Sequence, residues 1–161
     1  MQDDLARLRA MELWHKGYVA QMHGELERAV QLYTESIELL PTAEAYTFRG
    51  WAYSFMGRTD EAISECHKAI EVDPEFGNPY NDIGAYLMGK GELDDAVVWF
   101  ERAKQAGRYE PRHFPFMNLG RLYAAKGMVL RAIEEFEAAL RIEPDEPLCQ
   151  KMVVQLRAML N

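Results

Sequence analysis

The stretch that decides the fold runs from Gly50 to Pro74 and reads GWAYSFMGRTDEAISECHKAIEVDP. It contains two runs with apolar residues at three- and four-residue steps. Neither run has an internal proline, so the pattern predicts two helices. Gly57 separates the runs, and Pro74 follows the second run because proline cannot continue a helix. The stretch is therefore predicted to be a helix–turn–helix unit.

Copies of this unit occur on both sides of it. Three columns of small residues repeat together at steps of 33, 34 and 36 residues. The columns are the first glycines Gly17, Gly50, Gly84 and Gly120, the second glycines Gly24, Gly57, Gly91 and Gly127, and the alanines Ala29, Ala62, Ala96 and Ala132. Prolines end three of the units, at Pro41, Pro74 and Pro144. Because the columns shift by the same steps, they indicate an array of four repeats.

Each column has a physical reason. The first glycine and the alanine indicate that two helix backbones approach closely, since a larger side chain would overpack the contact. The second glycine is typical of a left-handed residue that ends the first helix. In the second unit we expect the buried residues to be Tyr46, the stem of Arg49, Gly50, Tyr53, Ala62, Ile63, Cys66, Ala69 and Ile70.

The pattern from Ala10 to Pro144 resembles the tetratricopeptide repeat family. The matching positions are Gly50, Tyr53, Gly57, Ala62, Ala69 and Pro74, and in the last unit Leu119, Gly120, Tyr123, Gly127, Ala132, Phe136, Ala139 and Pro144. The resemblance implies an all-α, right-handed superhelical array with a C-terminal capping helix. We expect one domain over residues 1–161, with repeats at about 10–42, 43–76, 77–112 and 113–146 and the capping helix at 147–160.

Two segments depart from the regular pattern. The first helix, from about Asp3 to His23, is longer than a repeat needs, which favours a helical lead-in. Its extra turns are alternatively a cap or a contact with a second chain. Two extra residues lie in AGRYEPRHFP after the third unit, where Lys104 replaces an apolar residue. We expect a wider loop there, interpreted as a tolerated insertion at the edge, or alternatively as a change of curvature that shapes a ligand site.

Two helix starts carry recognisable capping residues. Asn78 precedes Pro79, which predicts an asparagine N-cap followed by proline at the first helical position. Asp145 is placed to cap the last helix. The apolar stripe of that helix is predicted to be Leu148, Met152, Leu156 and Met159, or alternatively to include Val153 and Leu160.

The sequence contains no catalytic constellation and no phosphate-binding loop. Its four histidines are scattered, and its two cysteines, Cys66 and Cys149, match no zinc or redox spacing. We therefore expect no enzymatic activity, no catalytic residue, no metal and no cofactor. The net charge of −8 disfavours nucleic acid and anionic lipid as partners, and no apolar run suits membrane insertion. The N-terminus lacks a signal-peptide pattern, so we expect a reducing, cytoplasmic location.

The resemblance implies that first helices line an inner face where ligands bind. Residues placed on that groove are Trp14, Tyr18, Met22, Trp51, Phe55, Asn81, Met88, Phe114, Met117, Asn118 and Arg121. The first five form a cluster of large apolar groups that the core does not need, which is typical of interaction sites. The two asparagines suit the backbone of an extended peptide, and Arg121 suits a carboxylate. Alternatively, Trp14 and Trp51 pack on each other and are buried.

We therefore predict a non-enzymatic protein–protein interaction scaffold whose groove binds a peptide or helix with apolar anchors. The alternative is self-assembly into a homo-oligomer, with the groove or a convex patch at Val98 and Trp99 filled by another copy. One subgroup of the resembled family grips the acidic tail of heat-shock chaperones with lysine, arginine and asparagine. The corresponding residues here are Trp14, Tyr18, Phe48, Asn78 and Asp82. None matches in charge, so we expect no such binding.

Overall fold

The computed structural model describes residues 1–161 and contains nine α-helices and no strand beyond one isolated bridge. The helices are α1 (Gln2–Met22), α2 (Leu26–Leu39), α3 (Ala43–Phe55), α4 (Thr59–Val72), α5 (Asn78–Gly89), α6 (Leu93–Gln105), α7 (Phe114–Ala125), α8 (Val129–Ile142) and α9 (Pro147–Ala158). The first eight helices form four consecutive pairs, and α9 packs on α8. The predicted all-α array with a closing C-terminal helix is confirmed.

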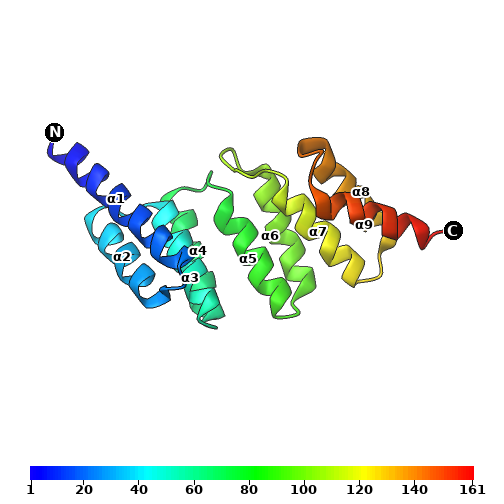
Figure 1. The fold of residues 1–161 in the computed structure, drawn as a ribbon, viewed down its shortest axis with the longest axis horizontal. Coiled ribbons are helices and arrows are strands. Elements are labelled where there is room, and N and C mark those ends of the chain that lie inside the picture. Colours follow the sequence, from blue (N-terminus) through cyan, green and yellow to red (C-terminus); the bar gives the residue numbers. More distant parts are fainter.

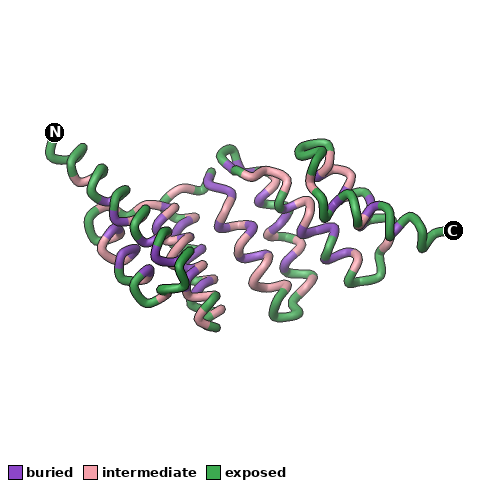
Figure 2. Tube along the Cα trace, viewed as in Figure 1, coloured by how far each residue is buried: buried purple, intermediate pink, exposed green.

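The array is elongated, with the two chain ends at opposite ends of the molecule (Figure 1). Contacts also run between alternate helices, from α1 to α3, from α3 to α5 and from α5 to α7. These odd-numbered helices therefore form one continuous row, which we call the inner row. The first turns of α1 project beyond the rest of the array and are exposed (Figure 2). No helix combines the length and apolarity needed to cross a membrane.

The turn inside each helical pair is made by the second glycine of the repeat. The backbone φ angles at these four positions are +79°, +77°, +81° and +72°, all in the left-handed region. A β-carbon added to any of them would meet no other atom within 4 Å. The conformation alone therefore requires glycine there, as the sequence predicted.

Replacing Gly57 with alanine is expected to lower the free energy of unfolding by about 1 kcal/mol, because a β-carbon disfavours left-handed backbone. Gly89 is the matched control: it is helical, has ordinary φ, and also has open space around it. Alanine at Gly89 should leave stability unchanged or raise it slightly, since alanine favours helix. Urea denaturation of the two variants measures the difference, and equal effects would contradict the proposed role of Gly57.

The first glycines have a different role from the one predicted. In three units an added β-carbon would lie 2.6–2.7 Å from an aromatic ring of the paired helix. The pairs are Gly17 with Tyr33, Gly84 with Phe100, and Gly120 with Phe136. In these units the glycine makes room for a ring, and not for a second backbone. Only in the second unit, where Cys66 replaces the ring, does the partner backbone come close, with Ala62 O 3.0 Å from the added atom on Gly50.

Three clusters of buried apolar side chains form the core along the array. The largest lies between α6 and α9, and α9 contributes Cys149, Val153 and Leu156 to it. The sequence-based stripe is therefore wrong at Leu148 and Met159, which are 36% and 70% exposed. The buried stripe is shifted by one residue, from Leu148 and Met152 to Cys149 and Val153, and the helix start is shifted by one residue as well.

The start of α9 is set by Glu146 and not by Asp145. The Glu146 carboxylate accepts a hydrogen bond from the backbone N–H of Cys149 at 2.7 Å, and Pro147 begins the helix. A side-chain acceptor for an N–H of the first turn is the usual function of an N-cap residue.

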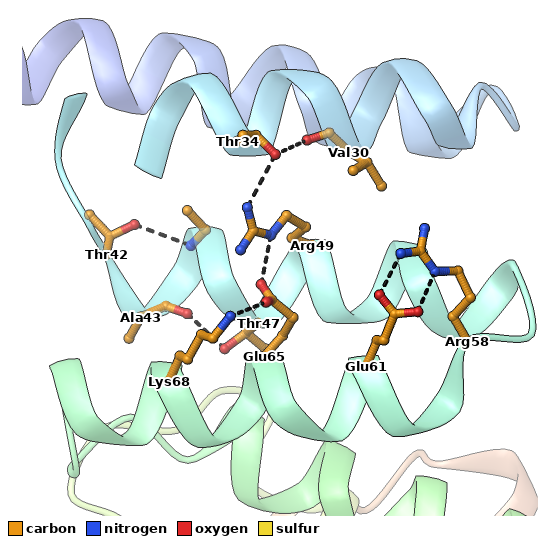
Figure 3. A network of polar contacts seen from close by, with 11 residues as sticks. Val30, Thr34, Thr42, Ala43, Thr47, Arg49, Arg58, Glu61, Glu65 and Lys68 are labelled. Atoms are coloured by element: carbon orange, nitrogen blue, oxygen red, sulfur yellow. Dashed lines mark hydrogen bonds and ion pairs between the residues drawn. The ribbon is translucent and has the colours of Figure 1, made fainter. Parts of the chain in front are cut away.

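A buried ion pair joins the two helices of the second unit. Arg49 Nε donates to Glu65 Oε2 at 2.6 Å, and Arg49 Nη1 donates to Thr34 Oγ1 at 3.1 Å (Figure 3). The Lys68 ammonium also donates to Glu65, at 3.0 Å. The expectation that only the stem of Arg49 is buried was wrong, because its charged end is held inside by a carboxylate that the sequence analysis did not place in the core.

The insertion after α6 forms the expected wider loop, residues 106–113, and this loop is anchored to the α4–α5 turn. The Gly77 N–H donates to Arg108 O, and the Arg108 N–H donates to Glu75 O, both at 2.9 Å. The Arg108 guanidinium pairs with Asp73 and Glu44. Tyr109 lies against Gly77, where an added β-carbon would meet its ring at 2.4 Å.

The unusual Lys104 at the end of α6 is also explained by an ion pair. Its ammonium donates to Glu135 of α8 at 2.9 Å and to Glu101 of its own helix at 3.1 Å. It also lies 4.5 Å from the centre of the Phe116 ring. The other units have an apolar residue at this position, whereas the third unit connects α6 to α8 through the ion pair of Lys104 with Glu135.

Candidate functional site

A hollow of about 480 Å³ opens on the inner row, where α1, α3, α5, the 106–113 loop and the start of α7 meet. We call it the inner hollow. Its lining residues are Tyr18, Thr47, Phe48, Trp51, Asn78, Asn81, Asp82, Tyr109, Glu110, Pro111 and Phe114. Four of the groove residues predicted from the sequence are brought together here, namely Tyr18, Trp51, Asn81 and Phe114.

The aromatic side chains at the hollow are organised around Phe48. Trp14, Tyr18 and Trp51 each meet Phe48 edge to face, with ring centroids 5.2, 5.8 and 5.8 Å away. Phe55 extends the row, 5.3 Å from Trp51, and is exposed. Edge-to-face contacts at these distances are favourable and hold the rings in place. The alternative in which the two tryptophans bury each other is wrong, since both pack on Phe48.

Trp14 lies partly outside the site. It packs against the N-terminal core cluster and lines a second hollow of about 630 Å³ between α1, α2 and α3. Its indole Nε1 is buried and has no hydrogen-bond partner. Trp14 therefore contributes to the fold as well as to the aromatic row.

The two predicted asparagines are paired with each other. Asn118 Nδ2 donates to Asn81 Oδ1 at 3.0 Å, and both residues are buried. This bond joins α7 to α5 and holds the Asn81 side chain against the hollow. The amide N–H groups of Asn81 make no hydrogen bond within the chain, so they are available to an acceptor on a ligand.

Asn78 does not cap α5. Gly77 occupies the cap position without a side-chain bond, and Asn78 is the first residue of the helix. Its Oδ1 is buried and has no hydrogen-bond partner. The predicted cap is wrong because the bond between Gly77 and Arg108 moves the helix start by one residue. A buried acceptor without a donor carries an energetic cost, which a ligand that donates to it would remove.

Asp82 lies one turn after Asn78 on the same face of α5 and also lines the hollow. Burial raises the pKa of its carboxyl group to about 7. Burial is the only cause of the raised pKa, and no ion pair or hydrogen bond within the chain lowers it. No lysine or arginine lines the hollow.

The insertion supplies part of the wall. Tyr109, Glu110 and Pro111 line the hollow, and Tyr109 is 3% exposed. The insertion therefore lies at the inner hollow, and the interpretation of it as a tolerated insertion at the edge does not account for this position. The anchoring of Arg108 to the α4–α5 turn is what brings these residues over the inner row.

The remaining predicted residues lie elsewhere. Met88 and Met117 are partly buried against the C-terminal core, while Met22 and Arg121 are exposed outside the hollow. Phe48 and Asp82 were not predicted as ligand-binding residues. Both are among the positions compared above with the chaperone-tail subgroup, and that comparison was the signal that could have identified them.

Neither a reactive Cys66 thiolate nor a metal-binding cluster is added to this site. Cys66 is fully buried, and burial raises the pKa of its thiol well above the ordinary value, so the reactive thiolate is disfavoured. No group of three or more His, Cys, Asp or Glu side chains is arranged to hold a metal ion.

The geometry defines a class of protein: a helix–turn–helix solenoid with a ligand-sized recess in its inner row. A family model described as the tetratricopeptide repeat matches residues 43–76, and a second one of the same description matches residues 116–146. Residues 43–76 and 116–146 therefore match the tetratricopeptide repeat, and proteins built from this repeat are protein-interaction scaffolds.

Similar proteins include the small glutamine-rich tetratricopeptide repeat-containing protein 2 of Mycosarcoma maydis, which is 32% identical over 101 residues. That match covers 62% of this chain and 28% of the relative, so the chain matches less than a third of the relative's length. Among solved structures, Pseudomonas aeruginosa PilF has a TM-score of 0.86 at 23% identity, covering 97% of this chain and 69% of that one. YrrB, described as a TPR protein with an unusual peptide-binding site, has a TM-score of 0.66 at 23% identity, covering 93% and 77%. These two likenesses concern the fold.

Proposed function

We propose that this chain is a non-enzymatic scaffold whose inner hollow binds an extended peptide or a helix through apolar anchors. The supporting observation is the aromatic wall of an open recess, formed by Tyr18, Phe48, Trp51 and Phe114. The volume of about 480 Å³ lies within the usual range for ligand pockets. Packing of the core does not require these aromatic side chains to line an open recess. YrrB, similar in fold, is described as having a peptide-binding site.

The wall has the properties of a binding surface. Trp51 and Phe114 are only partly covered, and large aromatic groups gain much free energy when a partner buries them. Phe48 holds the neighbouring rings, so little side-chain entropy is lost on binding. The unused N–H groups of Asn81 suit a carbonyl of a peptide backbone.

The same proposal treats residues 1–161 as one repeat domain with the unit boundaries predicted from the sequence. It also places the chain in a reducing, cytoplasmic compartment. The support for the latter is that both cysteines, Cys66 and Cys149, are free thiols buried in the core.

Replacing Trp51 with alanine is expected to weaken peptide binding by about thirtyfold or more, because central aromatic anchors contribute about 2 kcal/mol or more. The ligand is a peptide selected by the wild-type protein from a displayed library of random 12-residue sequences. Its affinity is then measured by fluorescence anisotropy with wild-type and variant proteins.

The control is Trp99→Ala on α6. Trp99 lies outside the inner hollow and packs on His67 and Tyr80. This variant should retain the affinity of the wild type. If Trp51→Ala binds as tightly as Trp99→Ala, or if no peptide is selected, the proposed function is wrong.

Self-association remains the second candidate. The observation that favours it is the exposed stripe of Leu5, Leu8 and Met11 on the projecting turns of α1, the first two being 64% and 63% exposed. The convex patch is smaller than predicted, because Trp99 is engaged by its neighbours and Val98 alone is well exposed. Light scattering over a dilution series tests this candidate. A monomer at every concentration would remove it.

A further inference from the structure

We propose that the inner hollow is selective for a basic side chain, arginine above all, of the bound peptide, with Asp82 as counter-ion and Asn78 as a second acceptor. This inference rests on the proposed function and names the chemistry of the ligand. It differs from apolar anchoring alone, since it requires a positive charge beside the apolar residues. Four features of the hollow support it.

The first feature is a pair of acceptors without donors. Asn78 Oδ1 is buried and makes no hydrogen bond, and the Asp82 carboxylate has no ion pair. The two residues are four apart on α5 and face the same hollow. A guanidinium has five N–H donors in a planar fork and no acceptor, so one group is able to bond both residues.

The second feature is the aromatic wall around these acceptors. Tyr18, Phe48, Trp51, Tyr109 and Phe114 line the same hollow as Asp82. Aromatic faces attract cations, and a guanidinium also stacks on them because it is planar and weakly hydrated. Arginine therefore suits this wall better than the compact, strongly hydrated ammonium of lysine.

The third feature is the distribution of charge. No basic residue lines the hollow, whereas the exposed Glu110 adds a second carboxylate to its wall. Two arginines flank the lining residues of the loop: Arg108 pairs with Asp73 and Glu44, and Arg112 donates to the backbone carbonyls of Ala106 and Gly107. The whole chain has a net charge of −8. A cationic ligand is therefore attracted, and an anionic one is repelled.

The fourth feature is the ionisation of Asp82. With a pKa of about 7, the carboxyl is about half protonated at neutral pH, and a bound cation favours the charged form. The ionisable groups around it are the thiol of Cys66, the phenols of Tyr18, Tyr86 and Tyr109, and the carboxylate of Glu110. Burial raises the pKa of Cys66, Tyr86 and Tyr109, so these groups stay neutral. Affinity for a cationic peptide should therefore rise between pH 6 and pH 8.

The experiment uses an array of acetylated, amidated random octapeptides probed with the whole wild-type chain. Arginine, and lysine to a lesser degree, should be enriched among the bound peptides. The best binder is then compared with a copy in which citrulline, the neutral isostere, replaces arginine. Against the wild type, citrulline should lower the affinity about tenfold or more, as expected for charge-assisted hydrogen bonds.

The matched variants are Asp82→Asn and Asp145→Asn. Both remove one negative charge, but Asp145 is exposed in the turn before α9, far along the chain from the hollow. With Asp82→Asn the arginine peptide should bind about tenfold more weakly, and citrulline should make little further difference. With Asp145→Asn the full effect of citrulline should persist, because this residue does not contact the peptide.

The stability of Asp82→Asn provides a folding control. The folded carboxyl keeps its proton up to about pH 7, while the unfolded one loses it near pH 4. Stability therefore falls as the pH rises between these values, and asparagine removes that loss. Asp82→Asn should unfold at a higher temperature than the wild type at pH 8. If this variant does not fold, the citrulline comparison on the wild type alone decides.

The outcomes separate the two proposals. If peptides bind without preference for basic residues and citrulline binds as well as arginine, the inference is wrong while the scaffold function stands. If citrulline costs as much with Asp82→Asn as with the wild type, Asp82 is not the counter-ion. If no peptide binds the wild type, the proposed function fails and this inference fails with it.

Discussion

Replacing Phe136 with alanine is expected to lower the free energy of unfolding by about 3–5 kcal/mol, which is the usual cost of removing a buried phenylalanine. The side chain projects from α8 and is fully buried in the largest core cluster, which also contains residues of α7 and α9. Its ring lies against Gly120, which leaves room for it on α7. Urea denaturation followed by circular dichroism measures the change.

A second substitution, at Gly120, tests whether the Phe136 ring contacts this glycine. Alanine at Gly120 alone should cost about 1–3 kcal/mol, because its β-carbon would lie 2.7 Å from the Phe136 ring. Once the ring is removed, the new methyl group enters the space that the ring occupied. The double variant should therefore be clearly more stable than the sum of the single effects predicts. Additivity within about 0.5 kcal/mol would contradict the contact. Phe55→Ala, the same change at an exposed site, should cost little.

Replacing Arg49 with methionine is expected to lower the free energy of unfolding by about 3–5 kcal/mol, because it leaves the Glu65 carboxylate buried without its main partner. The side chains of Arg49 and Glu65 are only 13% and 5% exposed. Lys68, the other cation on Glu65, is about half exposed and replaces little of the lost interaction. Thermal and urea denaturation both report this loss.

A double variant tests whether the loss of stability comes from the unpaired Glu65 charge or from lost packing. Arg49→Met with Glu65→Leu removes both charges and keeps apolar volume, so it should recover most of the lost stability. Arg9→Met, which breaks the exposed pair with Glu12, is the control and should leave stability almost unchanged. If Arg49→Met costs no more than Arg9→Met, the ion pair contributes nothing to the fold.

The repeat could be predicted from the sequence because its signals are local. A left-handed residue between two helices requires glycine whatever surrounds it, and all four second glycines have positive φ. The apolar spacing of each run likewise predicts a helix from its own residues. The helices, their pairing and the repeat type follow from these periodic positions. The backbone contact expected at Gly120 was wrong, but the fold prediction still held. A ring and a backbone both require a small residue at this position.

The sequence predicted Tyr18, Trp51, Asn81 and Phe114 of the recess, and only the tertiary structure decided which residues complete it. Phe48 and Asp82 occupy equivalent positions of successive repeats, but no spacing within the sequence places Tyr109 of the insertion beside them. The two-residue insertion acquires a role only because Arg108 binds the α4–α5 turn and carries Tyr109 over the inner row. Glu65 was not among the residues expected in the core, and only the fold places it beside Arg49. The local backbone conformation depends on each residue and its neighbours in the sequence. A binding site depends on contacts between repeats, because the fold determines which residues surround each side chain.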